Sequence, residues 1–165
     1  MKKFLFAVLF ALISLTTAFA AGKEFQFTST VTGITFRVPA NVKVIQDDIE
    51  AIILQTPDQM YTFTAEAFNV AEASQDEITA HMVELATSAK MDLENLDDVN
   101  NTTEYMTLIG MAYDYENGGA AVVGAAVVND TELGFYITVV AGPDYVDYAV
   151  NSLVTIDFDP DAVED

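Results

Sequence analysis

The sequence predicts an α+β fold: an antiparallel β-sheet with a long central helix and a second, C-terminal helix packed on it. Short runs in which apolar and polar residues alternate mark strands in both halves of the chain. One longer stretch, residues 74–96, has apolar residues three or four positions apart, as in an amphipathic helix. Tight-turn residues, not helices, join the strands that follow it, so neighbouring strands are expected to run antiparallel.

The first clear strand lies in GITFRVPANVKV, residues 33–44. Ile34, Phe36 and Val38 alternate with polar residues and are expected to face the core. Arg37, the only arginine of the chain, falls on the opposite, polar face. A solvated position paired with a carboxylate is the simplest interpretation of Arg37, and a binding-face or anion-binding role is the alternative.

The central helix begins at a capping box. Ser74 and Glu77 have the spacing at which each side chain caps the backbone N–H of the other. One apolar stripe follows, formed by Ile78, Met82, Leu85, Ala89, Leu93 and Leu96. The acidic, asparagine-rich residues 95–101 are expected to form an exposed loop.

Turn residues divide the other apolar runs into strands. Residues 49–56 and 60–70 are expected to form a hairpin, and Asn117-Gly118-Gly119 predicts a tight turn between residues 104–115 and 120–128. The run AAVVGAAVV at 120–128 is about half as long as a membrane-spanning helix. Its valines and small residues predict a central strand that is covered on both sides.

The last part of the chain adds a strand over residues 134–140 and a second helix that starts at Pro143. The inward residues of this helix are expected to be Val146, Ala149, Val150 and Leu153. A strand over 154–158 and an acidic tail, residues 160–165, follow. Together the elements predict a single α+β domain over residues 24–159.

The first twenty residues have the pattern of a signal peptide. Two lysines precede the apolar run Phe4–Ile13, and Ala18-Phe19-Ala20 supplies small residues before a cleavage site between Ala20 and Ala21. A periplasmic or secreted protein without a stable membrane anchor is therefore expected, and an uncleaved anchor is the alternative. The chain contains no cysteine, which excludes disulfides and a lipid-anchored lipoprotein.

Strong acidity limits the partners. The chain has 26 acidic and 6 basic residues, and loss of Lys2 and Lys3 with the leader changes the net charge from −20 to 4 − 26 = −22. Such a charge repels phosphate backbones, so no nucleic-acid partner is expected.

Three stretches resemble the PsbP-like superfamily: GITFRVPANVKV, LIGMAYDYENGG at 108–119 and YVDYAVNSLVTIDF at 145–158. The resemblance implies an α/β/α sandwich and a protein that binds or helps to assemble others, as an exported bacterial member of unknown function. The family includes PsbP subunits of photosystem II and a Ran-binding import factor, and it is not known as a class for catalysis. Pro39-Ala40-Asn41 lacks the tryptophan often found beside this strand, and no partner-binding residue carries over.

One weak metal site can be proposed from the sequence. Glu77, His81 and Glu84 fall on one stripe of the central helix, and His81 is the only histidine. Such a trio could weakly hold zinc or manganese. A hydrated helix boundary is the simpler interpretation, so neither a metal nor a cofactor is expected.

Tyrosines offer a candidate binding face. Tyr105, Tyr113 and Tyr115 are expected to share one strand face, and tyrosine suits recognition because its ring is rigid and amphipathic. Rings that complete a core are the alternative.

No catalytic motif is present. The sequence has no Gly-x-Ser-x-Gly and no glycine-rich phosphate loop before a helix. The sequence thus favours an exported, non-enzymatic binding or assembly module of the bacterial cell envelope, with an unknown envelope protein or small ligand as partner. A hydrolase that uses two carboxylates brought together in space is the alternative.

Overall fold

The computed structural model describes residues 23–163. The predicted signal peptide, its cleavage site and the last two residues of the acidic tail lie outside this range. The described elements are, in chain order, β1 Glu24–Thr28, β2 Ile34–Pro39, β3 Lys43–Asp47, β4 Ala51–Gln55, β5 Tyr61–Asn69, the 3-10 turn η1 Val70–Glu72, α1 Gln75–Ser88, β6 Asp97–Thr102, β7 Met106–Asp114, β8 Ala120–Val128, β9 Leu133–Ala141, the 3-10 turn η2 Pro143–Tyr145, α2 Val146–Val154 and β10 Asp157–Phe158.

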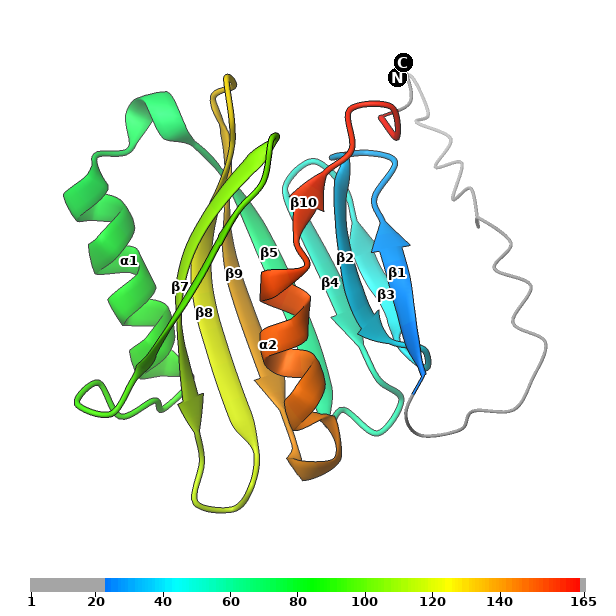
Figure 1. Ribbon diagram of the computed structural model, residues 1–165, viewed down its shortest axis with the longest axis vertical. Helices are drawn as coiled ribbons and strands as arrows, with labels where there is room; N and C mark the ends of the chain where they lie inside the picture. Colours follow the sequence, from blue (N-terminus) through cyan, green and yellow to red (C-terminus); the bar gives the residue numbers. More distant parts are fainter. Residues whose placement is uncertain (1–22, 164–165) are drawn as a thin grey trace, which may run out of the picture.

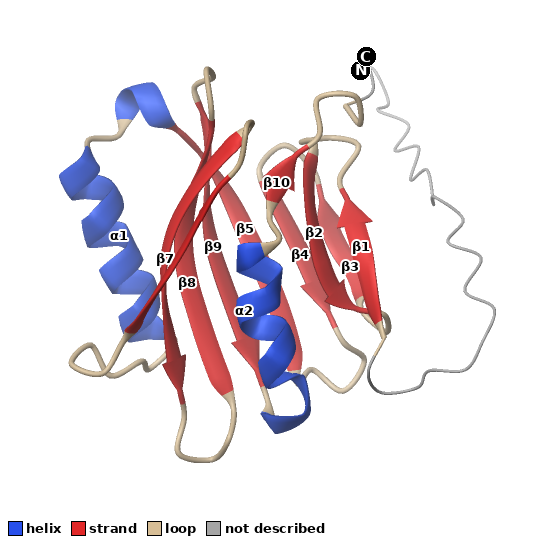
Figure 2. Cartoon of the chain, viewed as in Figure 1, coloured by secondary structure: helices blue, strands red, loops and turns tan. Residues whose placement is uncertain are grey.

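The strands form two sheets in which every pairing is antiparallel (Figure 2). The larger sheet has seven strands in the order β3-β4-β5-β9-β8-β7-β6, and the smaller has three in the order β1-β2-β10. Helix α1 lies on one side of the large sheet, whereas α2 and the small sheet cover the other (Figure 1). We call these the outer face and the inner face. The predicted antiparallel α+β fold with two helices is confirmed.

Strand β8 is the centre of the fold, as its sequence predicts. Eight of its nine residues are buried, and Val127 is half-buried. Ala121, Val123 and Ala125 face Met82 and Ala86 of α1. On the inner face Gly124 lies opposite Gly110 of β7. Leu153 of α2 packs there, with its Cδ2 3.1 and 3.3 Å from where a Cβ on Gly124 or Gly110 would lie, so a side chain at either position would push on Leu153.

The main core lies between the inner face, α2 and the small sheet. Phe36 of β2 stacks on Phe63 of β5 with ring centroids 4.0 Å apart, and this contact joins the two sheets. Ile34, Phe36 and Val38 are at most 1% exposed, which confirms that this side of the early strand faces the core. Each such side chain contributes about 1.5–3 kcal/mol by leaving water.

Helix α1 begins as predicted and ends earlier. Ser74 Oγ accepts from the Glu77 N–H (3.3 Å), and a Glu77 carboxylate oxygen accepts from the Ser74 N–H (2.8 Å). The apolar spacing predicted a helix as far as residue 96, but Lys90 has a φ of 59°, in the left-handed region that ends a helix. Leu93 is 47% exposed beyond that turn, so the prediction of a stripe through Leu93 was wrong.

Residues 95–101 are not a loop. Most of them belong to β6, an edge strand that pairs with β7 over six residues, and only Val99 within β6 is buried. Asn101 Nδ2 also donates to the carbonyl oxygen of Ile156 (3.0 Å). The loop prediction failed because an edge strand tolerates charged and polar residues, which protect its free edge from other chains.

The C-terminal elements differ in detail from the prediction. Ala149 and Leu153 are fully buried, but Val150 is 39% exposed because its side of α2 faces solvent. The strand predicted over 154–158 is reduced to the two residues of β10, since Val154 ends the helix. None of the helices within residues 23–163 is long and apolar enough to cross a membrane.

Candidate binding face beside helix α1

Helix α1 packs on β8 and leaves the outer face of the next strands partly exposed. Strand register places two rows of side chains there, one running Ile53–Thr64–Thr138 and the other Gln55–Thr62–Val140. All six are partly exposed, and Val140 is 41% exposed. We call these six residues the open face.

An aromatic row borders the open face. Phe68 of β5 stacks on Tyr136 of β9 with centroids 4.2 Å apart, and the ring centroid of His81 of α1 lies 4.3 Å from that of Tyr136. The Phe68 ring covers Gly134, since its Cε1 is 2.6 Å from where a Cβ would be. A side chain at Gly134 would therefore displace the row.

The three candidate metal ligands do not meet at one point. Glu77 serves the capping box, where hydrogen bonds from the backbone and side chain of Ser74 lower its pKa. Glu84 lies 3.5 Å from Nδ1 of His81, and His81 contributes its ring to the aromatic row. Burial raises the pKa of Tyr136, and the charge of Glu77 adds to this effect. Within residues 23–163 no three His, Cys, Asp or Glu side chains are grouped to hold a metal ion.

The tyrosines of the predicted face are separated. Tyr113 and Tyr115 make an edge-to-face pair at 5.3 Å and pack under α1, where the Tyr115 hydroxyl donates to the carbonyl of Ala89. Burial raises the pKa of Tyr115. Tyr105 is 41% exposed and precedes the other end of β7. A strand rise over eight residues places it about 26 Å from Tyr113, so the three rings do not form one cluster.

A shallow, open concavity lies at each end of the open face. The first, of about 590 Å³, is lined by Ile49, Glu50, Phe68, Asn69, Glu132 and Leu133, among others, and we call it the end pocket. The second, of about 460 Å³, is lined by Ser88, Ala89, Lys90, Tyr115, Asn117 and Val140. The open face thus runs between two hollows, one rimmed by carboxylates and the other bordered by a lysine.

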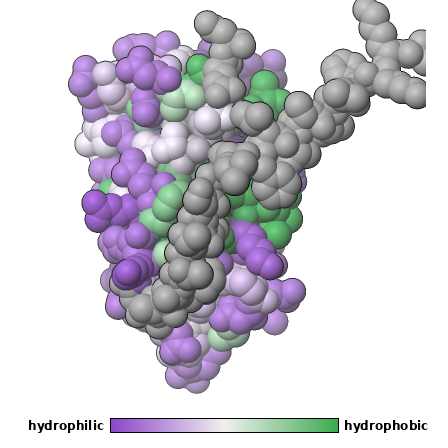
Figure 3. Space-filling model, turned by 90° about the vertical axis from the view of Figure 1, so that its right-hand side faces the viewer, coloured by the Kyte–Doolittle hydropathy of each residue, from purple (hydrophilic) through white to green (hydrophobic). Residues whose placement is uncertain are grey.

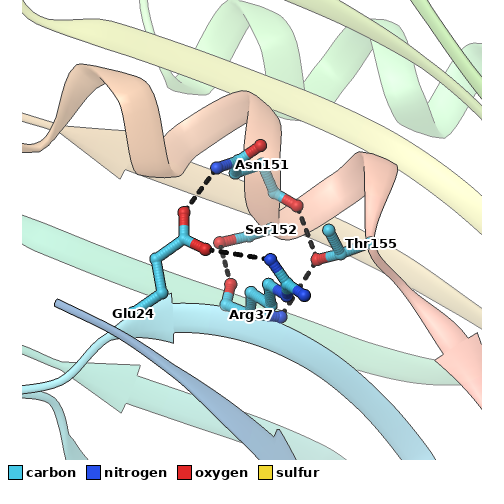
Figure 4. Close-up of polar contacts among 5 residues, drawn as sticks. All are labelled: Glu24, Arg37, Asn151, Ser152 and Thr155. Carbon is cyan, nitrogen blue, oxygen red and sulfur yellow. Dashed lines mark hydrogen bonds and ion pairs between the residues drawn. The ribbon is translucent and has the colours of Figure 1, made fainter.

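Arg37 lies away from this face, at a polar junction between β1, β2 and α2 (Figure 4). Its Nη1 is 3.3 Å from an oxygen of Glu24, whose other oxygen accepts from Asn151 Nδ2 (2.5 Å). The backbone of Arg37 donates to Thr155 Oγ1 (3.0 Å) and accepts from Ser152 Oγ (2.8 Å). Arg37 therefore has the carboxylate partner expected of a solvated strand position.

The two edge strands β1 and β3 carry further exposed apolar side chains: Phe25 at 36%, Val44 at 48% and Ile45 at 60%. Figure 3 views the molecule from this side and shows apolar surface among hydrophilic residues. A β-bulge interrupts the β3 register between Val44 and Gln46. Such a bulge twists an edge strand away from pairing with other chains.

Asp47 ends β3 and Asp48 follows it, and the two carboxyl groups lie in different surroundings. Burial raises the pKa of Asp47, which accepts from Ser29 Oγ (2.6 Å). Its neighbour Asp48 accepts hydrogen bonds from the backbone of Ala51 and Glu50, and these lower its pKa. The hydrolase alternative, which needs two carboxylates brought together in one cleft, stays a prediction.

Comparison with known proteins identifies the fold. No family model and no curated protein matches the chain. Among solved structures, it is similar to the Ran-binding protein Mog1p of Saccharomyces cerevisiae, with a TM-score of 0.50 and 8% identity over 86% of this chain and 99% of that one. A Bacteroides thetaiotaomicron VPI-5482 protein has a TM-score of 0.41 and 11% identity over 84% of this chain and 49% of that one. The likeness to Mog1p supports the predicted α+β fold.

The two neighbouring aspartates should affect stability with opposite pH dependence. Because the native state raises the pKa of Asp47, the carboxyl favours folding below its unfolded pKa, and this contribution is lost as the pH rises through the folded pKa. Asp47→Asn keeps an oxygen for Ser29 and should raise the free energy of unfolding at about pH 7, with a smaller gain at about pH 3.

Asp48→Asn is the matched comparison. The native state lowers the pKa of Asp48, so the ionised carboxylate stabilises the fold at pH values above the pKa that it has in the unfolded chain. This contribution is lost as the pH falls through the pKa of the folded state. The substitution should therefore destabilise at about pH 7 and have less effect at about pH 3. Urea denaturation at both pH values measures this, and a change of the same sign for both variants at the higher pH contradicts the assignment.

Proposed function

We propose that this protein is an exported, non-enzymatic binding or assembly module of the bacterial cell envelope, related to the PsbP-like superfamily. The observation that carries the proposal is the open face, a partly exposed sheet surface beside α1 with a hollow at each end. A sheet face in a domain of this kind is normally covered by another layer. A partner that covers this one would bury the aromatic row and the open face together.

The chemistry of the open face suits recognition. Thr62, Thr64 and Thr138 offer hydroxyl groups, and Ile53 and Val140 offer apolar area. The rings of Phe68 and Tyr136 are held by stacking, so little side-chain entropy is lost when a partner contacts them. Interfaces that combine apolar, hydroxyl and aromatic side chains in this way are common between proteins.

The similarity to Mog1p supports the same class of function by analogy. Mog1p is a Ran-binding protein. At 8% identity no binding residue carries over, so the analogy extends only to a fold that can present a protein-binding surface.

The envelope location rests on the leader. Removal of residues 1–20 before Ala21 should give a product found in the periplasm or the medium. Intact mass spectrometry of the protein from its native cells checks this. A mature species that retains Met1, or a product confined to the cytosol, contradicts the proposal.

Site-specific photo-crosslinking in the native cells tests the binding role. A benzophenone amino acid at Thr64 or Thr138 lies on the open face, and the same group at Glu94 lies in the exposed loop after α1. We expect one discrete crosslinked product from both open-face positions and none of that size from Glu94. Equal labelling from all three positions, or a product from Glu94 alone, would exclude the open face as the binding surface.

A further inference from the structure

The end pocket lies where β5 ends and β9 begins, at the register pair Asn69 and Leu133. Phe68 and Leu133 contribute apolar surface, and Ile49 stands beside them with 74% of its area exposed. An isoleucine exposed to this degree gains free energy when a partner covers it. The hollow is therefore suited to a group that has apolar atoms of its own.

The rim of the end pocket is acidic and held in place. The Ala67 N–H donates to the carbonyl of Glu50 (2.9 Å), and the Val70 N–H donates to the carbonyl of Glu132 (2.8 Å). Both glutamates are thus tied through their backbones to the end of β5. Asn69 is fixed as well, because its side chain accepts from the Ala71 N–H (2.9 Å).

Neither rim carboxylate has a cationic neighbour in the described chain. The ion pairs within residues 23–163 are Arg37 with Glu24 and His81 with Glu84. Residues 23–163 carry 4 basic side chains and 26 − 2 = 24 acidic ones, because Glu164 and Asp165 lie outside this range. The net charge of the described residues is therefore −20. The surrounding field repels an anion and attracts a cation.

The Phe68 ring is the third feature of the end pocket, beside its apolar surface and its acidic rim. It lies over Gly134, stacks on Tyr136 and also lines the end pocket. A cation near the face of an aromatic ring is attracted by the ring quadrupole, most strongly where water is partly excluded. A guanidinium or ammonium group bound in the end pocket would lie among residues that include Phe68, Glu50 and Glu132.

We infer that the end pocket binds an arginine or lysine side chain, flanked by apolar residues, in an exposed basic segment of the partner protein. The carboxylates of Glu50 and Glu132 receive the charge, the Phe68 ring faces it, and Ile49 covers the apolar neighbours. This inference rests on the proposed function and adds the chemistry of the partner.

Two short peptides of nearly the same shape test whether binding depends on the positive charge of the ligand. The probe is fluorescein-labelled Leu-Arg-Leu-Arg-Leu amide, and its control has citrulline, a neutral analogue of nearly the same shape, at both arginine positions. Binding to the mature protein is measured by fluorescence polarisation at low and at physiological salt. We expect the arginine peptide to bind at least about tenfold more tightly than the citrulline peptide, and salt to weaken it.

Two double variants locate the binding. Glu50→Gln with Glu132→Gln removes the rim charges, whereas Glu94→Gln with Glu116→Gln removes the same charge at the opposite end of the large sheet. We expect the first to weaken the arginine peptide about tenfold and the second less than about twofold. Amide chemical shifts of the wild-type protein should move with the peptide at Phe68, Asn69 and Leu133.

Several results would overturn the inference: equal binding of the two peptides, an equal loss in both double variants, or shift changes that avoid the end pocket. An equal loss would mean attraction by net charge alone. If Thr64 and Thr138 still crosslink to a specific partner while the arginine peptide fails to bind, the proposed function stands and only this inference is lost.

Discussion

The hydroxyl of Ser152 connects three elements that are far apart in the sequence. It lies 2.8 Å from the carbonyl oxygens of Arg37 and of Tyr148, and 2.6 Å from the hydroxyl of Tyr61. Carbonyl oxygens only accept, so the single hydrogen of Ser152 points to them and Tyr61 is the donor to Ser152. These hydrogen bonds join β5, α2 and β2, and the side chains of Tyr61 and Ser152 are both fully buried. Burial also raises the pKa of Tyr61, which keeps its hydroxyl protonated as this donor role requires.

The arrangement of the layers follows from this junction. With α2 attached to both sheets, Leu153 enters the gap over Gly110 and Gly124, and Phe36 reaches Phe63. The inner face of the large sheet is then covered along its length by α2 and the small sheet. Within residues 23–163, α1 is the one helix on the outer face, and it packs on β8, so the surface of β9, β5 and β4 stays partly exposed. The candidate binding face is thus a consequence of how unevenly the two sides are covered.

Local signals in the sequence predicted the parts of the fold that depend on local chemistry. The capping box at Ser74, the turn at Asn117-Gly118-Gly119 and the buried strand at 120–128 each follow from a few adjacent residues. The strand at β6 was missed because its pairing with β7, not its composition, makes it a strand. The helix end at Lys90 was missed because the apolar spacing continues beyond the left-handed turn.

The candidate site was less predictable for the same reason. Phe68, Gly134 and Tyr136 meet only through the register of β5 with β9. Glu50 and Glu132 line the same hollow only because each bonds through its backbone to the end of β5. His81 was identified as the only histidine, but its ring contact with Tyr136 needed the packing of α1. Glycine opposite an aromatic residue across paired strands is the one signal that could have indicated the aromatic row.

A double-mutant cycle on Tyr61 and Ser152 tests most directly whether this junction holds the layers together. Ser152→Ala strands the Tyr61 hydroxyl in the core and should lower the free energy of unfolding by about 2–3 kcal/mol, and Tyr61→Phe by about 1 kcal/mol. In urea denaturation the double variant should lose about 1 kcal/mol less than the sum, because neither polar group is then left without the other. Losses that add, or a Ser152→Ala variant as stable as the wild type, would contradict the account.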